Sequence, residues 1–183
     1  PGEMGHYFTW GDAEPIVLDS VDLGNRRGWY NYRWCKGEET TLRKYNTKEE
    51  SGAVDMRTTI LPEDDAATAI WGKEWRMPTS QDFRELCNSE YTTSEWVTVN
   101  GVKGRMITSR INGNSIFMPA GGRRFDSKTG FVGENGNYWS SSVVISMPCA
   151  ADLLDFSAAR MTRGTGDRYM GLTIRPVRAV KTE

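Results

Sequence analysis

Histidine and cysteine are scarce in this chain of 183 residues, and that scarcity excludes several kinds of site. His6 is the only histidine, so a histidine-based metal cluster cannot be built. A Ser-His-Asp triad would depend on this residue near the terminus, and no nucleophile-elbow motif accompanies it. Cys35, Cys87 and Cys149 lie far apart without a C-x-x-C spacing, which argues against zinc. We therefore expect no bound metal and no cofactor.

Long apolar runs and a large net charge are also missing. No run approaches the roughly 20 residues that cross a bilayer, so we expect no direct membrane insertion by this segment. A net charge of −1 with 11% aromatic residues excludes disorder for most of the chain. The basic residues of the C-terminal half are dispersed and form no known nucleic-acid motif, so we expect no nucleic-acid partner. They include Arg123, Arg124, Arg160, Arg163 and Arg168.

Tryptophan and glycine, by contrast, are abundant. Seven tryptophans and 19 glycines predict rigid aromatic anchors and tight turns with few long helices. The length corresponds to one domain, residues 1–183, that buries roughly 70% of its unfolded surface. The chain opens at Pro1 without a methionine, so we expect a segment upstream of it.

Two short helices are predicted near the middle of the chain. Pro62 and the three acids after it favour a helix that runs to about Trp71 and stops at Gly72. A second helix should follow Pro78, capped by one of the next two residues. Its buried stripe should hold Phe83, Leu86 and Cys87.

Short strands with period-two patterning follow the helices. Two Asn-Gly pairs predict hairpin turns within a three-stranded meander. We expect its strands at 96–99, 105–108 and 115–118, and further strands at 137–142, 151–156 and 172–177. A strand-like piece also occurs at 16–18, and the polar stretch 36–58 reads as a long surface excursion. Helices followed by antiparallel strands are typical of the α+β class.

Four sequence elements occur in an order and spacing typical of one known family. They are WRMPTSQDF at 75–83, NSIFMPAGG at 114–122, GNYWSSS at 136–142 and GLTIRPVR at 171–178. A weaker fifth element, GHYFTWG at 5–11, extends the match over nearly the whole chain. Together they resemble the Fibrobacter succinogenes major paralogous domain family. The resemblance implies a C-type-lectin-like α+β domain with two helices on a twisted antiparallel sheet, and a first strand upstream of residue 1.

The same resemblance implies a non-catalytic, ligand-binding surface domain. Formylglycine-generating enzymes share the fold, but their oxidase chemistry uses two C-terminal cysteines, and only Cys149 lies in that half. The triplets with which C-type lectins bind sugar through calcium are absent. We expect a protein or surface-glycan ligand and a location that is extracellular, at a bacterial cell surface or on a phage particle. The alternatives are an oxidase relative of the formylglycine-generating type and a structural, pilus-associated module.

Residues 143–170 have an unusual composition. They contain none of the chain's 37 Lys, Glu, Gln, Asn and Trp residues. A core strand with small-residue loops would avoid these types. In some relatives of the family, however, a diversity-generating retroelement rewrites this stretch by mutating adenines in asparagine-type codons. The residues reachable from such codons are Ser146, Cys149, Ala150, Leu153, Asp155, Ser157, Arg160, Thr162, Gly164, Thr165, Gly166, Asp167 and Tyr169; Met147 and Met170 are not reachable.

Period-two alternation in this segment predicts a binding face. If Leu154 and Phe156 face the core, Leu153 and Asp155 face solvent. We expect one contiguous, solvent-facing patch with the residue types favoured at interfaces. Its predicted members are Met147, Cys149, Leu153, Asp155, Arg160, Thr162, Arg163, Asp167 and Tyr169. We expect Trp75, Trp139 and Arg175-Pro176 to be structural.

Overall fold

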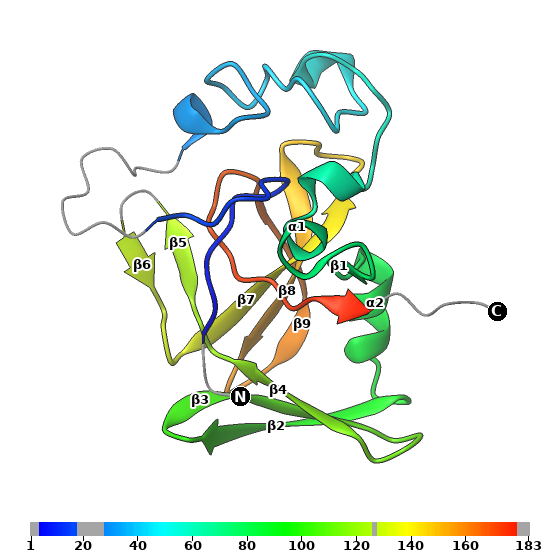
Figure 1. Ribbon diagram of the computed structural model, residues 1–183, viewed down its shortest axis with the longest axis vertical. Coiled ribbons are helices and arrows are strands. Elements are labelled where there is room, and N and C mark those ends of the chain that lie inside the picture. Colours follow the sequence, from blue (N-terminus) through cyan, green and yellow to red (C-terminus); the bar gives the residue numbers. More distant parts are fainter. Residues whose placement is uncertain (1–3, 18–27, 126–127, 179–183) are drawn as a thin grey trace.

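Helices are few and strands short in the computed structural model, which describes residues 4–17, 28–125 and 128–178 (Figure 1). The helices are α1 (Ala66–Trp71) and α2 (Ser80–Leu86), with 3-10 turns η1 (Trp29–Asn31), η2 (Glu49–Ser51) and η3 (Pro62–Asp64). The strands are β1 (Trp75–Arg76), β2 (Thr92–Val99), β3 (Val102–Ser109), β4 (Ser115–Pro119), β5 (Arg123–Phe125), β6 (Lys128–Gly130), β7 (Asn135–Val143), β8 (Ala150–Ser157), β9 (Met161–Asp167) and β10 (Val177–Arg178).

All paired strands in these described ranges run antiparallel, in four small sheets. Two sheets have three strands, in the orders β2-β3-β4 and β7-β8-β9, and two are the pairs β1-β10 and β5-β6. Two helices with several antiparallel sheets agree with the predicted α+β class. The single twisted sheet expected from the sequence is instead divided among these smaller sheets.

Side-chain caps explain where the two helices begin. The carboxylate of Asp65 accepts hydrogen bonds from the amides of Ala67 and Thr68, so α1 starts after Asp65 and the predicted first turn from Pro62 is the separate η3. The Thr79 hydroxyl and the Asp82 carboxylate cap α2 reciprocally. α1 ends at Trp71 with Gly72 as its C-cap, as predicted.

The predicted meander is confirmed as the β2-β3-β4 sheet. Asn100 and Gly101 both adopt positive φ, 50° and 81°, in the two-residue turn between β2 and β3. This conformation matches the twist of paired strands and suits Asn-Gly.

Strand predictions were less successful elsewhere. β9 was not predicted, because Gly164 and Gly166 lower β propensity. Of the predicted strand 172–177, only Val177 belongs to a strand, and Leu172 makes an isolated bridge with Phe8. In the piece 16–18, Ile16 donates to the carbonyl of Tyr7 without forming a strand, and residue 18 lies outside the described residues.

The hydrophobic core divides around the sheet β7-β8-β9. On one face, Phe156 stacks on Tyr138 and packs with Phe83 of α2 and Met118 of β4. On the other face, Trp139 packs within a cluster that also contains Trp10, Tyr45, Leu153 and Leu172. This sheet is therefore covered on both sides.

Residues 28–58, called the excursion from here on, form an outer layer drawn in blue to cyan at the top of Figure 1. They contain two 3-10 turns and no strand, and the irregular structure of 36–58 agrees with the prediction for that polar stretch. Tyr32, Cys35 and Leu42 form a small buried cluster of their own. The excursion is therefore an ordered, irregular layer with its own apolar centre.

Candidate binding surface

The predicted exposure of Leu153 is wrong. Its side chain is only 5% exposed and lies in the cluster of Trp139 on the second covered face of the sheet. Period-two alternation correctly places Leu153 and Leu154 on opposite faces of β8. The prediction also assumed that the face of Leu153 meets solvent, and that face is covered. A strand buried on both faces reads as a continuous apolar run, and Leu153-Leu154 is such a run.

Two glycines of β9 make room for this leucine. Gly164 and Gly166 lie across from β8, and Leu153 pairs with Gly164. A Cβ atom at Gly166 would lie 3.0 Å from Leu153 Cδ2 and 3.3 Å from the Trp139 ring. The two glycines are therefore required for packing, although both belong to the residues that are reachable from asparagine-type codons.

One group of predicted residues gathers at the β8-β9 turn. The Asp155 carboxylate accepts a hydrogen bond from Asn137 Nδ2 (2.8 Å) and pairs with Arg160 Nη2 (3.2 Å). Thr162 lies directly across from Asp155 in the strand register. Asp155, Arg160 and Thr162 are called the turn group, and Arg160 is its most exposed member.

A second group lies at the opposite end of the hairpin. It comprises Met147, Cys149, Asp167 and Tyr169, called the loop group. Met147 is exposed and the other three are half-buried. The Tyr169 ring packs edge-on against Trp29 of the excursion, with ring centroids 5.1 Å apart.

The electrostatics of the loop group disfavour a reactive cysteine. Burial raises the pKa of the Cys149 thiol, and the negative charges of Glu39 and Asp167 raise it further. Burial also raises the pKa of the Tyr169 hydroxyl, with Asp167 adding to the effect. Cys149 is therefore a protonated thiol at neutral pH, whereas nucleophilic cysteines have a lowered pKa.

Arg163 stands apart from both groups. Strand alternation places it on the opposite face of β9 from Thr162, where its Nη1 donates to the Ser80 hydroxyl at the start of α2 (3.1 Å). The nine predicted residues are therefore distributed over the two ends and both faces of one hairpin, with Leu153 buried between them. They lie around β9, which is an edge strand of its sheet, and do not form one flat patch.

Arg168 connects the loop group to the excursion. Its side chain is fully buried, and the guanidinium donates to the Tyr32 hydroxyl and to the carbonyls of Lys44, Tyr45 and Pro148 at 2.9–3.1 Å. In the sequence, Asp167 and Tyr169 are the neighbours of Arg168. Met147 and Cys149 are likewise the neighbours of Pro148, whose carbonyl Arg168 binds. The charge pattern predicted that Arg168 is one of several dispersed surface charges, and this is wrong; the family resemblance instead implied that Arg168 belongs to a fixed frame between the variable positions. The aromatic-rich sequence before residue 36 was the available signal, because the guanidinium also stacks over Trp10 (4.6 Å).

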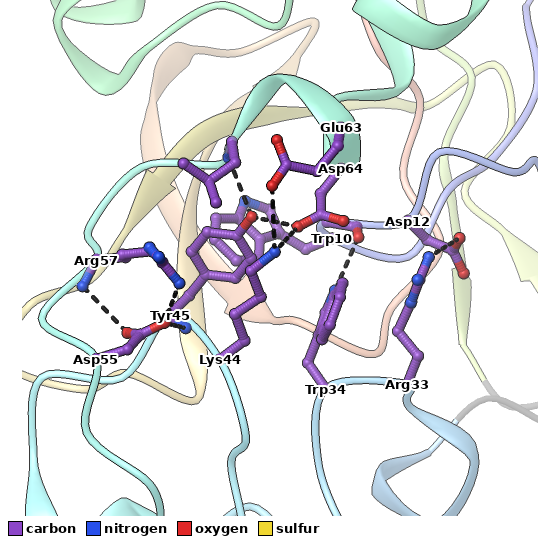
Figure 2. Close-up of polar contacts among 12 residues, drawn as sticks. Trp10, Asp12, Arg33, Trp34, Lys44, Tyr45, Asp55, Arg57, Glu63 and Asp64 are labelled. Carbon is purple, nitrogen blue, oxygen red and sulfur yellow. Dashed lines mark hydrogen bonds and ion pairs between the residues drawn. The ribbon is translucent and has the colours of Figure 1, made fainter.

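A second polar cluster fixes the excursion to η3, as Figure 2 shows. Asp64 is buried and accepts hydrogen bonds from the Tyr45 hydroxyl and from Lys44 Nζ (2.5 Å). Lys44 also lies over the Trp34 ring at 4.8 Å. Burial raises the pKa of the Tyr45 hydroxyl, and the hydrogen bond to Asp64 raises it further. The excursion is thus fixed by interactions of buried polar side chains.

Comparisons with known proteins give no relative for this chain. No family model, no curated protein and no solved structure matches it. Among the described residues, no three His, Cys, Asp or Glu side chains are placed to hold a metal ion together. Within the same ranges, no helix has the length and apolar character of a membrane span.

Proposed function

We propose that this chain is a C-type-lectin-like domain that binds a ligand without catalysis, through the turn group and the loop group of the β8-β9 hairpin. The fold proposal rests on the four sequence elements that resemble the Fibrobacter family. They are distant in the sequence but adjacent in space. β1 of the first element pairs with β10 of the last, and the Ser141 amide donates to the Pro78 carbonyl. The Tyr138 hydroxyl donates to the Pro119 carbonyl, which joins the remaining element.

The observation that carries the binding proposal is the buried Arg168 directly beneath the loop group. Its five-donor guanidinium holds backbone from the excursion and from the β7-β8 loop in place. The loop-group side chains are exposed or half-buried on either side of Arg168. Arg168 fixes the backbone that carries them. Recognition residues carried on a rigid scaffold have this arrangement.

The proposal also includes the hypothesis that this chain is the diversified binding protein of a diversity-generating retroelement, with fewer variable positions than the codon pattern suggested. A retroelement that rewrote 143–170 would meet packing limits at Ala150, Leu153, Gly164 and Gly166. Asp155 is limited as well, because it accepts from the buried Asn137 amide, so we expect variation to concentrate at Arg160, Thr162, Thr165 and Tyr169. Sequencing the DNA beside the gene tests this directly. A reverse-transcriptase gene with a near-copy of the 3′ coding end supports the hypothesis, and flanking DNA without either overturns it.

The proposed ligand is a protein or a surface glycan, met outside the cell or at a bacterial or phage surface. Both classes suit a surface around an edge strand where arginine, tyrosine and methionine side chains lie. The proposal assigns no enzymatic activity, because Cys149 has a raised pKa and Cys87, the next cysteine, belongs to another part of the core. An oxidase relative and a pilus-associated module remain the alternative functions.

The decisive experiment is a binding screen against glycan arrays and intact bacterial cells with two matched variants. The first combines Met147→Ser, Arg160→Ala and Tyr169→Ala. The second changes the same kinds of side chain around the β3-β4 loop, where Ile111, Arg110 and Tyr91 are exposed. The proposal predicts that any ligand found is lost by the first variant and kept by the second. The reverse result, or equal losses, overturns it.

A further inference from the structure

A cavity of about 450 Å³ lies away from the β8-β9 hairpin. The N-terminal segment, the end of α1, β1 and the chain just before β10 enclose it, and Figure 1 shows α1, β1 and β10 close together. Its volume falls in the range of small-molecule sites, which are concave and mainly apolar with a few polar groups. The side chains that matter most here are His6, Trp71, Trp75, Tyr138 and Arg175.

Aromatic side chains form much of its wall. Trp71 is 47% exposed and Trp75 is half-buried, although Trp10 and Trp139 of the same chain are fully buried. Tryptophan buries a large apolar area when it is covered. Two tryptophans left partly open to one cavity provide apolar surface for a flat ring.

Among the described residues that line the cavity, Arg175 is the one Lys, Arg, Asp or Glu. Arg175 is exposed and makes no hydrogen bond or ion pair with the part of the chain that the structure describes. The sequence analysis expected it to be structural, and its exposure contradicts that. Its positive charge offsets part of the rise that burial causes in the Tyr138 pKa, so the guanidinium acts on the cavity wall. No carboxylate lines the cavity among the described residues, and Glu74 nearby pairs with Arg178 (2.8 Å).

We propose that this cavity binds a small ring compound that carries a carboxylate. The ring packs against Trp71 and Trp75, and the carboxylate pairs with Arg175, whose planar guanidinium matches it with two parallel hydrogen bonds. His6 lines the same cavity, and its imidazole adds a further hydrogen-bonding group. Aromatic acids and sugar acids share this chemistry. The proposal is independent of the binding surface on the β8-β9 hairpin.

Titration calorimetry with matched probes tests it. Indole-3-acetate and glucuronate represent the two sources, and indole-3-acetamide and glucose are their uncharged counterparts. We expect at least one acid to bind about tenfold more tightly than its neutral partner, or about 1.4 kcal/mol. Binding by indole-3-acetate alone identifies an aromatic acid, and binding by glucuronate alone identifies a sugar acid.

Variants locate the binding. Arg175→Gln should lower the affinity for the acid about tenfold and leave that for the neutral partner unchanged, whereas Trp71→Ala should weaken both. Arg110→Gln, an exposed arginine on the β3-β4 loop, is the matched control and should change neither. Equal binding of acid and neutral probe, an unchanged affinity in Arg175→Gln, or no heat from either acid at millimolar concentration overturns the proposal. Thermal unfolding of each variant separates these results from misfolding.

Discussion

The two three-stranded sheets and the excursion are both ordered, but different interactions order them. In the sheets, backbone hydrogen bonds run along β2-β3-β4 and β7-β8-β9, and apolar side chains fill both faces of the latter. In the excursion, paired strands are absent from residues 28–58, and scattered backbone hydrogen bonds, such as that from the Leu42 amide to the Ser51 carbonyl, are supplemented by side chains. Asp55, for example, accepts from the amides of Tyr45, Asn46 and Arg57.

The difference shows where sensitivity to single substitutions is concentrated. A sheet shares its stability among many equivalent backbone bonds, so a side chain there contributes mainly through packing. The excursion depends on a few buried polar groups that each satisfy several backbone atoms, and leaving such atoms unpaired is costly. Four substitutions, in order of decreasing expected effect, separate the two cases.

Trp139→Ala should have the largest effect. Trp139 is fully buried, and its Nε1 donates to the Phe8 carbonyl (2.9 Å). Loss of a large buried aromatic side chain typically costs about 3–5 kcal/mol of unfolding free energy. Urea denaturation should show this loss. Trp71→Ala, which removes a half-exposed tryptophan, should cost well under half as much, and similar losses in the two variants would contradict the assignment of Trp139 to the core.

Arg168→Met should come next, and its effect should be regional. Methionine keeps apolar bulk but leaves the carbonyls of Lys44, Tyr45 and Pro148 without a donor, at about 1–3 kcal/mol for a buried unsatisfied group. We expect about 3 kcal/mol in total. Hydrogen exchange should accelerate in the excursion before it does in β2-β3-β4. If hydrogen exchange accelerated equally in the excursion and in β2-β3-β4, Arg168 would stabilise the whole domain and not the excursion in particular.

The contrast between the two regions also explains what the sequence could predict. Apolar periodicity and Asn-Gly turns identified the meander, and Pro62 with its following acids and a capping residue after Pro78 indicated the two helices, because these signals are local. β9 escaped prediction, since its glycines are required by contact with Leu153, a residue on the neighbouring strand. Periodicity describes one strand at a time and carries no information about what covers each face.

The candidate site was predictable to a similar degree. Composition drew attention to 143–170, and alternation predicted that Asp155 faces solvent, whereas its side chain is half-buried. Composition and periodicity could not predict the burial of Arg168, because the atoms that satisfy its guanidinium come from residues 32–45 and 148, far away in the sequence. Arginine is ordinarily a surface residue, and only long-range contacts identify the exceptions.

Asp55 should make the excursion sensitive to acid. Burial alone would raise the pKa of its carboxyl, but the hydrogen bonds from the amides of Tyr45, Asn46 and Arg57 lower it overall. Because the folded-state pKa lies below the unfolded value of about 3.9, this stabilisation is complete above that pH and is lost as the pH falls through the folded pKa. Asp55→Asn should cost about 1–2 kcal/mol at neutral pH, since an amide NH₂ cannot accept from these donors.

The measurement for Asp55 is unfolding free energy as a function of pH. Between neutral pH and pH ~3 the wild type should lose more stability than Asp55→Asn, because the variant has no carboxylate to protonate at this site. Glu38→Gln, which changes an exposed carboxylate elsewhere in the excursion, should follow the wild type. Parallel curves for all three proteins would remove Asp55 as the source of the acid sensitivity.

The smallest effect should come from Arg160→Ala, and it differs from the effect of removing its partner. Arg160 pairs with Asp155 at 3.2 Å, but its side chain is 70% exposed, and an ion pair in solvent contributes at most about 1 kcal/mol. Asp155→Ala should cost more, because it also leaves the buried amide of Asn137 without its acceptor. Denaturant unfolding of the two single variants should therefore give unequal losses, with Arg160→Ala within about 0.5 kcal/mol of the wild type. Equal losses would mean that the exposed ion pair, and not the buried hydrogen bond beneath it, holds the turn group in place.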